Sequence, residues 1–294
     1  PGYAMAWGYL SFARCTMMLF RTFDETGPHT IAAMEKALAL EPEQSEALAV
    51  KALMTQLLER DWETAGRLYQ RAIASSRSPW AFGSYAIFYL QFIDQQRQAI
   101  EIIAAAEKLD PLHAGIKANL AGVLYFTGND DAAIRKAREA LQLDPEHLLA
   151  LEHLIRAYAN INDTAALASL LDSLSPALLA RAEIKAHIAR SYALQGNEAK
   201  ARKTYNDLVA SLDRLTPLAV FDTALLAVSL GEIDESVVLM ERLEKIDSWM
   251  QFWTKLLPAE NSTIRDNPRY QALLKRMGLD DESVAALNER MSFK

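Results

Sequence analysis

The side chains best suited to metal binding in this chain are its five histidines and its 38 acidic residues. A metal site on one helix needs His or carboxylate ligands at positions i and i+3 or i+4. His147 and His153 are six residues apart with Glu146 and Glu152 beside them, so no three ligands share one helix face. The single cysteine, Cys15, excludes an intrachain disulfide and a cysteine-rich metal site. We therefore predict that the chain has no metal site.

The sequence also lacks the motifs that usually carry catalysis or cofactor binding. It contains no glycine-rich phosphate loop, no zinc motif and no nucleophile elbow. Gly128 and Gly196 lie at expected helix joints, where turns account for them. We therefore expect no cofactor, no catalytic residue and no enzymatic activity in this chain.

Composition excludes two further classes of function. The net charge is −7, which argues against nucleic-acid binding because phosphate contacts need clustered Lys and Arg. The sequence has no apolar run of about 18 residues, the length that a membrane span requires. These features predict a soluble chain without a membrane partner, and we expect it in the cytoplasm.

A period of about 34 residues organises the chain. Alanine recurs at nearly the same helical position in two series, one at Ala37, Ala72, Ala106 and Ala140 and the other at Ala65, Ala99, Ala133, Ala166 and Ala201, continued by Ser236. Such a period is typical of stacked helix pairs, which usually present a binding surface.

The clearest unit runs from Asp110 to Pro145. Its first half, the A helix, has apolar residues at the spacing of one helix face, and Gly128 then ends this helix. Asn129 or Asp130 can cap the second, or B, helix, whose alanines predict close contact between the two helices.

This pattern resembles the tetratricopeptide repeat. The matching residues are Trp7 and Leu10 in the first unit, Ala65, Tyr69 and Ala72 in the second, Leu120, Ala133, Ala140 and Pro145 in the fourth, and Gly196, Ala201 and Tyr205 in the sixth. The resemblance implies an all-α fold, a right-handed superhelix of about seven helix pairs over residues 1–247. The expected B helices begin near Pro28, Asp61, Asp94, Asn129, Asn162, Gly196 and Gly231.

Two segments depart from the repeat. The first unit carries about seven extra residues over 20–28, which we interpret as a long connection between its two helices, either functional or simply tolerated. After Asp247 the period ends, and residues 248–294 are expected to cap the array. Within them we predict a helix from Pro268 to Gly278, capped by Asp266 or Asn267, and another from Asp281 to about Arg290.

The segment at residues 264–279 resembles the end of the tetratricopeptide region in large bacterial signalling proteins. In those proteins the N-terminal effector is a winged-helix DNA-binding domain, a class III nucleotide cyclase or a protein kinase. Pro1 also stands where a repeat would close, so we expect the chain to be a fragment of such a regulator.

In this family the A helices line a concave groove that binds peptides. Carried over to this chain, the resemblance implies partner-binding residues at Tyr85, Phe88, Asn119, Tyr125, Arg156 and Arg190. Recognition of a chaperone carboxylate is excluded because Glu152 and His153 stand where basic residues are needed.

The sequence thus predicts a non-catalytic module that binds a protein or peptide, and possible homodimers. The alternative is a structural spacer or dimerisation arm of a multidomain enzyme such as an adenylate cyclase.

Overall fold

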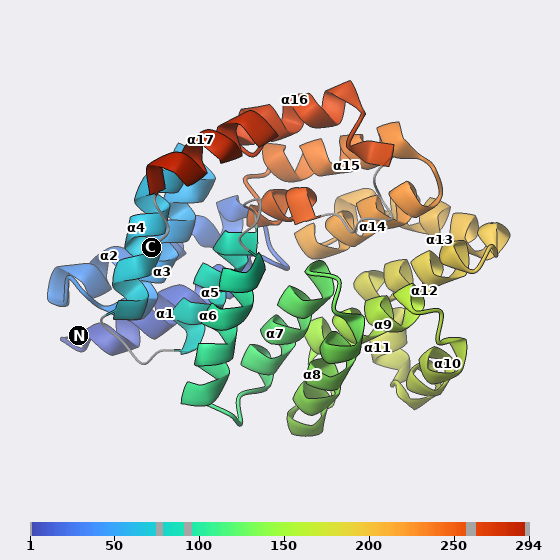
Figure 1. Cartoon of the computed structure of the whole chain (residues 1–294), viewed down its shortest axis with the longest axis horizontal. Helices are drawn as coiled ribbons and strands as arrows, with labels where there is room; N and C mark the ends of the chain where they lie inside the picture. Colours follow the sequence, from blue (N-terminus) through green and yellow to red (C-terminus); the bar gives the residue numbers. More distant parts are fainter. Residues whose placement is uncertain (1, 75–78, 91–95, 257–262, 292–294) are drawn as a thin grey trace. The chain divides into compact units, whose positions relative to one another are not determined.

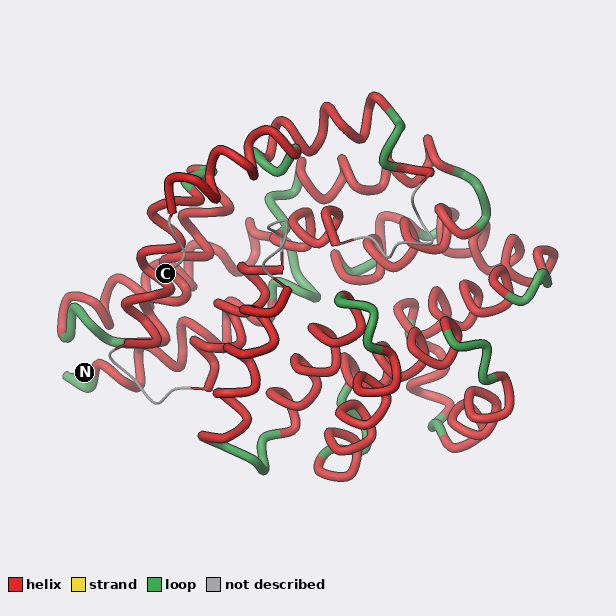
Figure 2. Tube along the Cα trace, viewed as in Figure 1, coloured by secondary structure: helices red, strands yellow, loops and turns green. Residues whose placement is uncertain are grey.

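The computed structural model describes residues 2–74, 79–90, 96–256 and 263–291, and these residues form helices joined by short loops. Figures 1 and 2 show this arrangement, and the described trace contains no strand. The all-α fold predicted from the sequence is confirmed. Among the described helices, none combines the length and the apolar composition that a membrane span needs.

The chain divides into two compact units. Unit 1 comprises Pro1–Pro111, Leu243–Leu256 and Gln271–Lys294, whereas unit 2 comprises Leu112–Arg242 and Leu257–Tyr270. Segments distant in sequence therefore belong to one unit. The assignment of residues 248–294 to a cap of the array remains a prediction.

Unit 1 contains the first three helix pairs and elements from the end of the chain. Its elements are α1 (Ala4–Met17), α2 (Phe23–Leu40), α3 (Ser45–Met54) with a π-helical turn η1 (Thr55–Glu59), α4 (Trp62–Ala74), α5 (Pro79–Leu90), α6 (Gln96–Leu109), a 3₁₀ segment η3 (Trp249–Leu256), most of α16 (Pro268–Met277), and α17 (Asp281–Met291). The helix α17 packs against α4.

Unit 2 contains four helix pairs. Its elements are α7 (Ala114–Phe126), α8 (Asp130–Leu143), α9 (Leu148–Asn160), α10 (Thr164–Ser173), a short α11 (Pro176–Ala180), α12 (Ala182–Leu194), α13 (Glu198–Ala210), a 3₁₀ turn η2 (Leu212–Arg214), α14 (Pro217–Ser229) and most of α15 (Ile233–Lys245). Across the described residues the two units give seven A–B pairs, as the repeat predicted.

The joints between A and B helices follow from local chemistry. Gly128, Gly196 and Gly231 have φ of 76°, 77° and 79°, the left-handed conformation that ends a helix without a Cβ clash. The side chain of Asn129 accepts a hydrogen bond from the amide of Ala132 and caps α8, which decides between the two predicted capping residues.

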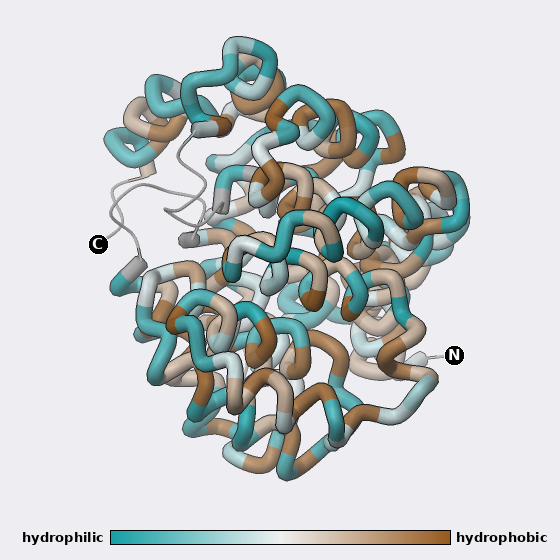
Figure 3. The backbone as a smooth tube through the Cα atoms, turned by 90° about the vertical axis from the view of Figure 1, so that its right-hand side faces the viewer, coloured by the Kyte–Doolittle hydropathy of each residue, from teal (hydrophilic) through white to brown (hydrophobic). Residues whose placement is uncertain are grey.

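The repeating alanines form the contacts between paired helices. Their side chains are fully buried at Ala37, Ala65, Ala72, Ala99, Ala106, Ala133, Ala140 and Ala201, whereas Ala166 is half-buried. Ser236 is also buried, and its hydroxyl donates to the carbonyl of Ala224 at 2.9 Å, which satisfies the polar atom. Figure 3 shows apolar and polar residues alternating along the helices, as amphipathic packing requires.

The predicted long connection in the first repeat is wrong. The helix α2 already begins at Phe23, and Pro28 lies inside it. Thr22 and Glu25 form a capping box, in which the Thr22 amide donates to the Glu25 carboxylate at 2.9 Å. This cap starts the helix earlier than the proline suggested, so the extra residues lengthen α2. The predicted B-helix start at Asp94 lies outside the described residues.

The end of the chain has the helices that the sequence predicted. The side chain of Asn267 accepts hydrogen bonds from the amides of Arg269 and Tyr270 and so starts α16, while Gly278 has φ of 68°. In unit 2, Asn267 donates to Asp234 on α15 at 2.9 Å. In unit 1, Arg276 pairs with Glu244 at 2.7 Å. These contacts hold α16 along the last B helix.

Candidate functional site

The two predicted binding residues in unit 1, Tyr85 and Phe88, are core residues of α5. Their exposed fractions are 3% and 1%. Tyr85 stacks on Tyr69 with 5.7 Å between ring centroids, and its hydroxyl lies 2.9 Å from that of Tyr89. Burial raises the pKa of Tyr85 far above its ordinary value, so the phenol stays neutral. Phe88 also packs 6.2 Å from Trp62 of α4. This aromatic cluster joins the second and third repeats.

On α7 the predicted residues lie in different environments. Asn119 is half-buried, whereas Tyr125 is 4% exposed. The Tyr125 ring centroid lies 6.5 Å from that of His153 on α9. Gly122 makes this packing possible, because a Cβ there would lie 2.6 Å from the His153 Nε2 atom. Asn119 is therefore the most accessible of the predicted set.

Arg156 and Arg190, the last two predicted residues, are both buried. The guanidinium of Arg156 lies at the centre of a charged cluster that we call the Arg156 cluster, formed with Glu152 and His153 of α9, His187 of α12 and Asp222 of α14. Arg156 Nη2 lies 2.7 Å from Asp222 Oδ1, 3.0 Å from His187 Nε2 and 3.6 Å from Glu152 Oε2. The cluster therefore connects the A helices of three successive repeats.

Burial sets the protonation of this cluster. It raises the pKa of Glu152 well above the ordinary value, and the negative charge of Asp222 raises it further. It lowers the pKa of His153 well below the ordinary value, and the positive charge of Arg156 adds to this effect. The pKa of His187 is also lowered by burial, which Asp222 partly offsets. The arrangement favours an ion pair between Arg156 and Asp222, with Glu152, His153 and His187 kept neutral beside it.

Three members of the Arg156 cluster have the chemistry of metal ligands. One ligand atom each of Glu152, His187 and Asp222 lies within 4.8 Å of the others. A divalent ion would need to approach each ligand to about 2.0–2.2 Å. Arg156 Nη2 already lies within 3.6 Å of an oxygen or nitrogen atom of each of the three residues, and its positive charge would repel such an ion. The residues therefore fit an internal ion-pair cluster better than a metal centre.

Ligand spacing along a single helix gives no sign of this cluster, because its ionisable residues come from three helices. Glu152, His187 and Asp222 follow one another at intervals of 35 residues, so they occupy the same position in three successive A helices. The signal in the sequence that points to the Arg156 cluster is the recurrence of ionisable residues at the spacing of the repeat.

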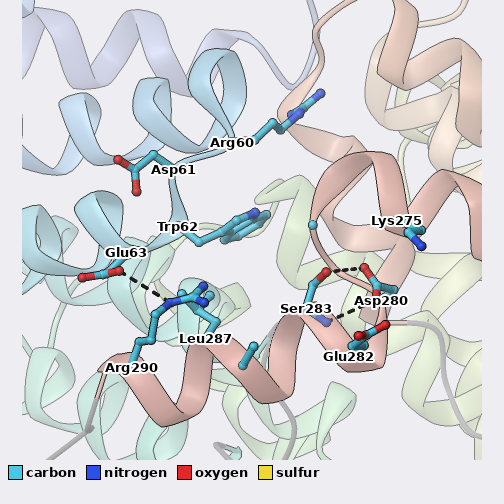
Figure 4. Close-up of a pocket in the computed structure, with 12 residues that line it drawn as sticks. Arg60, Asp61, Trp62, Glu63, Lys275, Asp280, Glu282, Ser283, Leu287 and Arg290 are labelled. Carbon is cyan, nitrogen blue, oxygen red and sulfur yellow. Dashed lines mark hydrogen bonds and ion pairs between the residues drawn. The ribbon is translucent and has the colours of Figure 1, made fainter.

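A second candidate site is a pocket of about 590 Å³ in unit 1, which the sequence analysis did not predict. It lies between the beginning of α4 and the helices α16 and α17 (Figure 4). Its lining residues are Arg60, Asp61, Trp62, Glu63, Lys275, Gly278, Asp280, Glu282, Ser283, Ala286, Leu287 and Arg290.

The pocket wall is fixed by contacts between α4 and the end of the chain. Trp62 is 5% exposed, and its indole N–H donates to the Met277 carbonyl at 2.9 Å. Arg290 lies 3.7 Å from Glu63, as the dashed line in Figure 4 shows. The wall therefore carries both acidic and basic side chains.

Comparison with known proteins supports the fold. No protein-family model and no curated protein matches the sequence. Among solved structures, the chain is similar to yeast Tom70, with a TM-score of 0.56 and 15% identity over 96% of this chain. It is also similar to a tetratricopeptide repeat protein from Parabacteroides merdae, with a TM-score of 0.53 and 12% identity over 82% of this chain and 94% of that chain.

These similarities show the fold alone. The described helices are paired as in tetratricopeptide proteins, which confirms the fold implied by the sequence resemblance. The chain spans 63% of the Tom70 chain that it matches.

Proposed function

We propose that this chain is a non-catalytic module that binds a protein or peptide through the face formed by its A helices. The observation that carries the proposal is the packing of A helices against one another. In unit 1, α3 packs against α1 and α5, and in unit 2 the contacts run from α7 to α9, α12 and α14. Successive A helices thus form a continuous face within each unit, and such faces in repeat proteins commonly bind partners.

The predicted residues take different roles in this proposal. Asn119 is accessible enough to contact a partner directly through its amide, which both donates and accepts hydrogen bonds. The five buried residues, Tyr85, Phe88, Tyr125, Arg156 and Arg190, support the face from beneath. They would meet a partner only where neighbouring side chains move aside. Aromatic and arginine side chains are the usual anchors of interfaces, so these five residues belong to the proposed binding face.

We further propose that the module is the regulatory part of a cytoplasmic bacterial signalling or transcription regulator. The support is the resemblance of residues 264–279 to the end of such regulators. Several apolar residues of this segment are buried, among them Ile264, Tyr270, Leu273 and Leu279. The segment therefore has a packing role, as a regular part of a repeat domain would.

A matched pair of substitutions tests partner binding. Asn119→Glu places a negative charge on α7, whereas Gln142→Glu introduces the same charge at an exposed site on the B helix α8. We expect a partner captured from extract of the source organism by the parent chain to be lost with Asn119→Glu, by at least tenfold, and retained with Gln142→Glu. Equal retention by both variants would contradict binding on this face.

A further inference from the structure

Arg60, the residue directly after η1, is a half-buried cation without a carboxylate partner. Its Nη2 atom donates to the Oε1 atom of Gln251 at 2.9 Å, whereas its Nη1 atom is buried and has no hydrogen-bond partner in the described part of the chain. Figure 4 shows the side chain directed away from Asp61 and Glu63, and no carboxylate of the described residues forms an ion pair with it. Burial lowers the pKa of Arg60 below its ordinary value, because the charges around it do not fully replace the lost water.

The residues that cover Arg60 belong to η3. Gln251 and Phe252 of this segment are 0% and 1% exposed. The centroid of the Phe252 ring lies 5.4 Å from the guanidinium carbon of Arg60 and 5.1 Å from the ring centroid of Trp62, to which it is edge-on. An amide oxygen and an aromatic ring that are adjacent in sequence therefore make the contact between η3 and the beginning of α4.

The backbone on both sides of this contact departs from a regular α-helix. The segment η3 is a 3₁₀ helix of eight residues, which is longer than most 3₁₀ helices, and the hydrogen bonds of such helices have poor geometry. Asp247, just before η3, has φ of 47°, and Arg60 has φ of 56°, a left-handed conformation that is uncommon outside glycine. The side chains of η3 therefore hold it in place more than its own backbone does.

The contact of η3 with Arg60 is chemically incomplete, because the amide of Gln251 brings no charge to the guanidinium. Arginine binds a carboxylate more strongly than a neutral acceptor and can engage both of its oxygens. Glu244 does not supply this carboxylate, since it pairs with Arg276 at 2.7 Å. A carboxylate in the place of the Gln251 amide would pair with Nη2 and bring a second acceptor for Nη1. The surroundings of Arg60 therefore favour a segment in which an acidic residue directly precedes an aromatic residue.

We propose that Arg60 and Trp62 form a second peptide-binding site, which η3 occupies as an internal ligand. Its partner is a peptide segment in which an acidic residue directly precedes an aromatic residue, and this segment displaces Gln251 and Phe252. The site lies in unit 1, whereas Asn119 lies in unit 2, so the failure of this proposal would leave the binding proposal for the A-helix face intact.

Fluorescence anisotropy with two labelled peptides tests the site on the full chain. One peptide has the sequence of residues 247–255, and the other has glutamate in place of the glutamine that corresponds to Gln251. We expect the glutamate peptide to bind about tenfold more tightly, because it alone brings a carboxylate to Arg60. The two peptides should bind equally to Arg60→Gln. Equal binding of both peptides to the parent chain, a preference that persists in Arg60→Gln, or no binding of either peptide overturns the proposal.

Competition by η3 gives a second test, in which the chain is changed instead of the peptide. An internal ligand lowers the apparent affinity for an added peptide in proportion to the fraction of closed sites. Gln251→Glu should hold η3 on Arg60 and weaken binding of the glutamate peptide about tenfold, whereas Phe252→Ala should strengthen it. Gln142→Glu, at an exposed position of α8, is the matched control and should leave the affinity unchanged.

Circular dichroism checks that each variant folds, and the comparison of the two peptides on the parent chain needs no variant. An unchanged affinity in folded Gln251→Glu would show that η3 does not compete for the site, which overturns the proposal.

Discussion

Arg156 is the residue on which the buried charges of unit 2 depend. Its guanidinium lies 2.7 Å from Asp222 Oδ1, and its side chain is only 1% exposed. A buried carboxylate that loses its cation is left without compensation, which costs far more than the loss of an exposed ion pair. The sequence predicts Arg156 as a partner-binding residue, and in the structure its side chain links the A helices of three successive repeats.

We expect Arg156→Ala to lower the free energy of unfolding by about 3–5 kcal/mol. The control is Arg97→Ala, because the pair of Arg97 and Glu101 is exposed, with 86% and 63% of the side chains accessible. This control should change stability by less than about 0.5 kcal/mol. Urea unfolding of both variants measures the difference, and a loss below about 1 kcal/mol for Arg156→Ala would show that the cluster is not held by this charge.

Glu152 gives a pH-dependent prediction. Its folded pKa is well above its ordinary value of 4.5, so the folded chain keeps a proton that the unfolded chain releases as the pH rises. The contribution of Glu152 to the free energy of unfolding is fully present below pH 4.5. It falls by about 1.4 kcal/mol per pH unit as the pH rises toward the folded pKa. Glu152→Gln removes this loss because the amide is neutral at every pH.

The free energy of unfolding of Glu152→Gln, measured with urea, should therefore rise relative to that of the parent chain between pH 5 and pH 8. His153 and His187 have lowered pKa values and destabilise the fold as the pH falls below 6.5, but they are present in both proteins and cancel in the comparison. Glu101→Gln, at an exposed carboxylate, is the control and should show a constant difference. A pH-independent difference for Glu152→Gln would mean that Glu152 is ionised in the folded chain.

At the scale of elements, α4 packs directly against the C-terminal helices α16 and α17. Trp62 of α4 donates to the carbonyl of Met277, the last residue of α16, at 2.9 Å. Met291 of α17 lies over Gly66, where an added Cβ would be 2.0 Å from the Met291 methyl carbon. These contacts place the two helices beside the second repeat within unit 1.

We expect Trp62→Phe to lower the free energy of unfolding by about 1–3 kcal/mol, because the buried Met277 carbonyl loses its donor. Amide hydrogen exchange in residues 268–291 should also be faster in Trp62→Phe than in the parent chain. Trp249→Phe is the control, since the Trp249 indole nitrogen has no hydrogen-bond partner among the described residues. Unchanged exchange in Trp62→Phe would show that this hydrogen bond does not hold the helices to α4.

The elements were largely predictable because their signals are local. Gly128, Gly196, Gly231 and Gly278 marked joints that the structure confirms with positive φ. Pro28 gave a wrong start for α2, because the capping box at Thr22 begins this helix before the proline. Neither the Arg156 cluster nor the contact of Trp62 with Met277 has a local signal, because each joins residues far apart in sequence.

At the scale of the whole molecule, the 34-residue period accounts for both the fold and the proposed function. Repetition places A helices side by side within each unit, and small residues at fixed positions let the paired helices approach closely. The period also explains why ionisable residues recur as a column at Glu152, His187 and Asp222.

Photo-crosslinking gives a direct test of whether the A-helix face binds a protein or peptide. A benzophenone side chain at position 119 of α7 should link the chain to a partner in cells, whereas the same group at position 142 of α8 should not. Crosslinks from position 142 alone, or equal crosslinks from both positions, would contradict binding on the A-helix face.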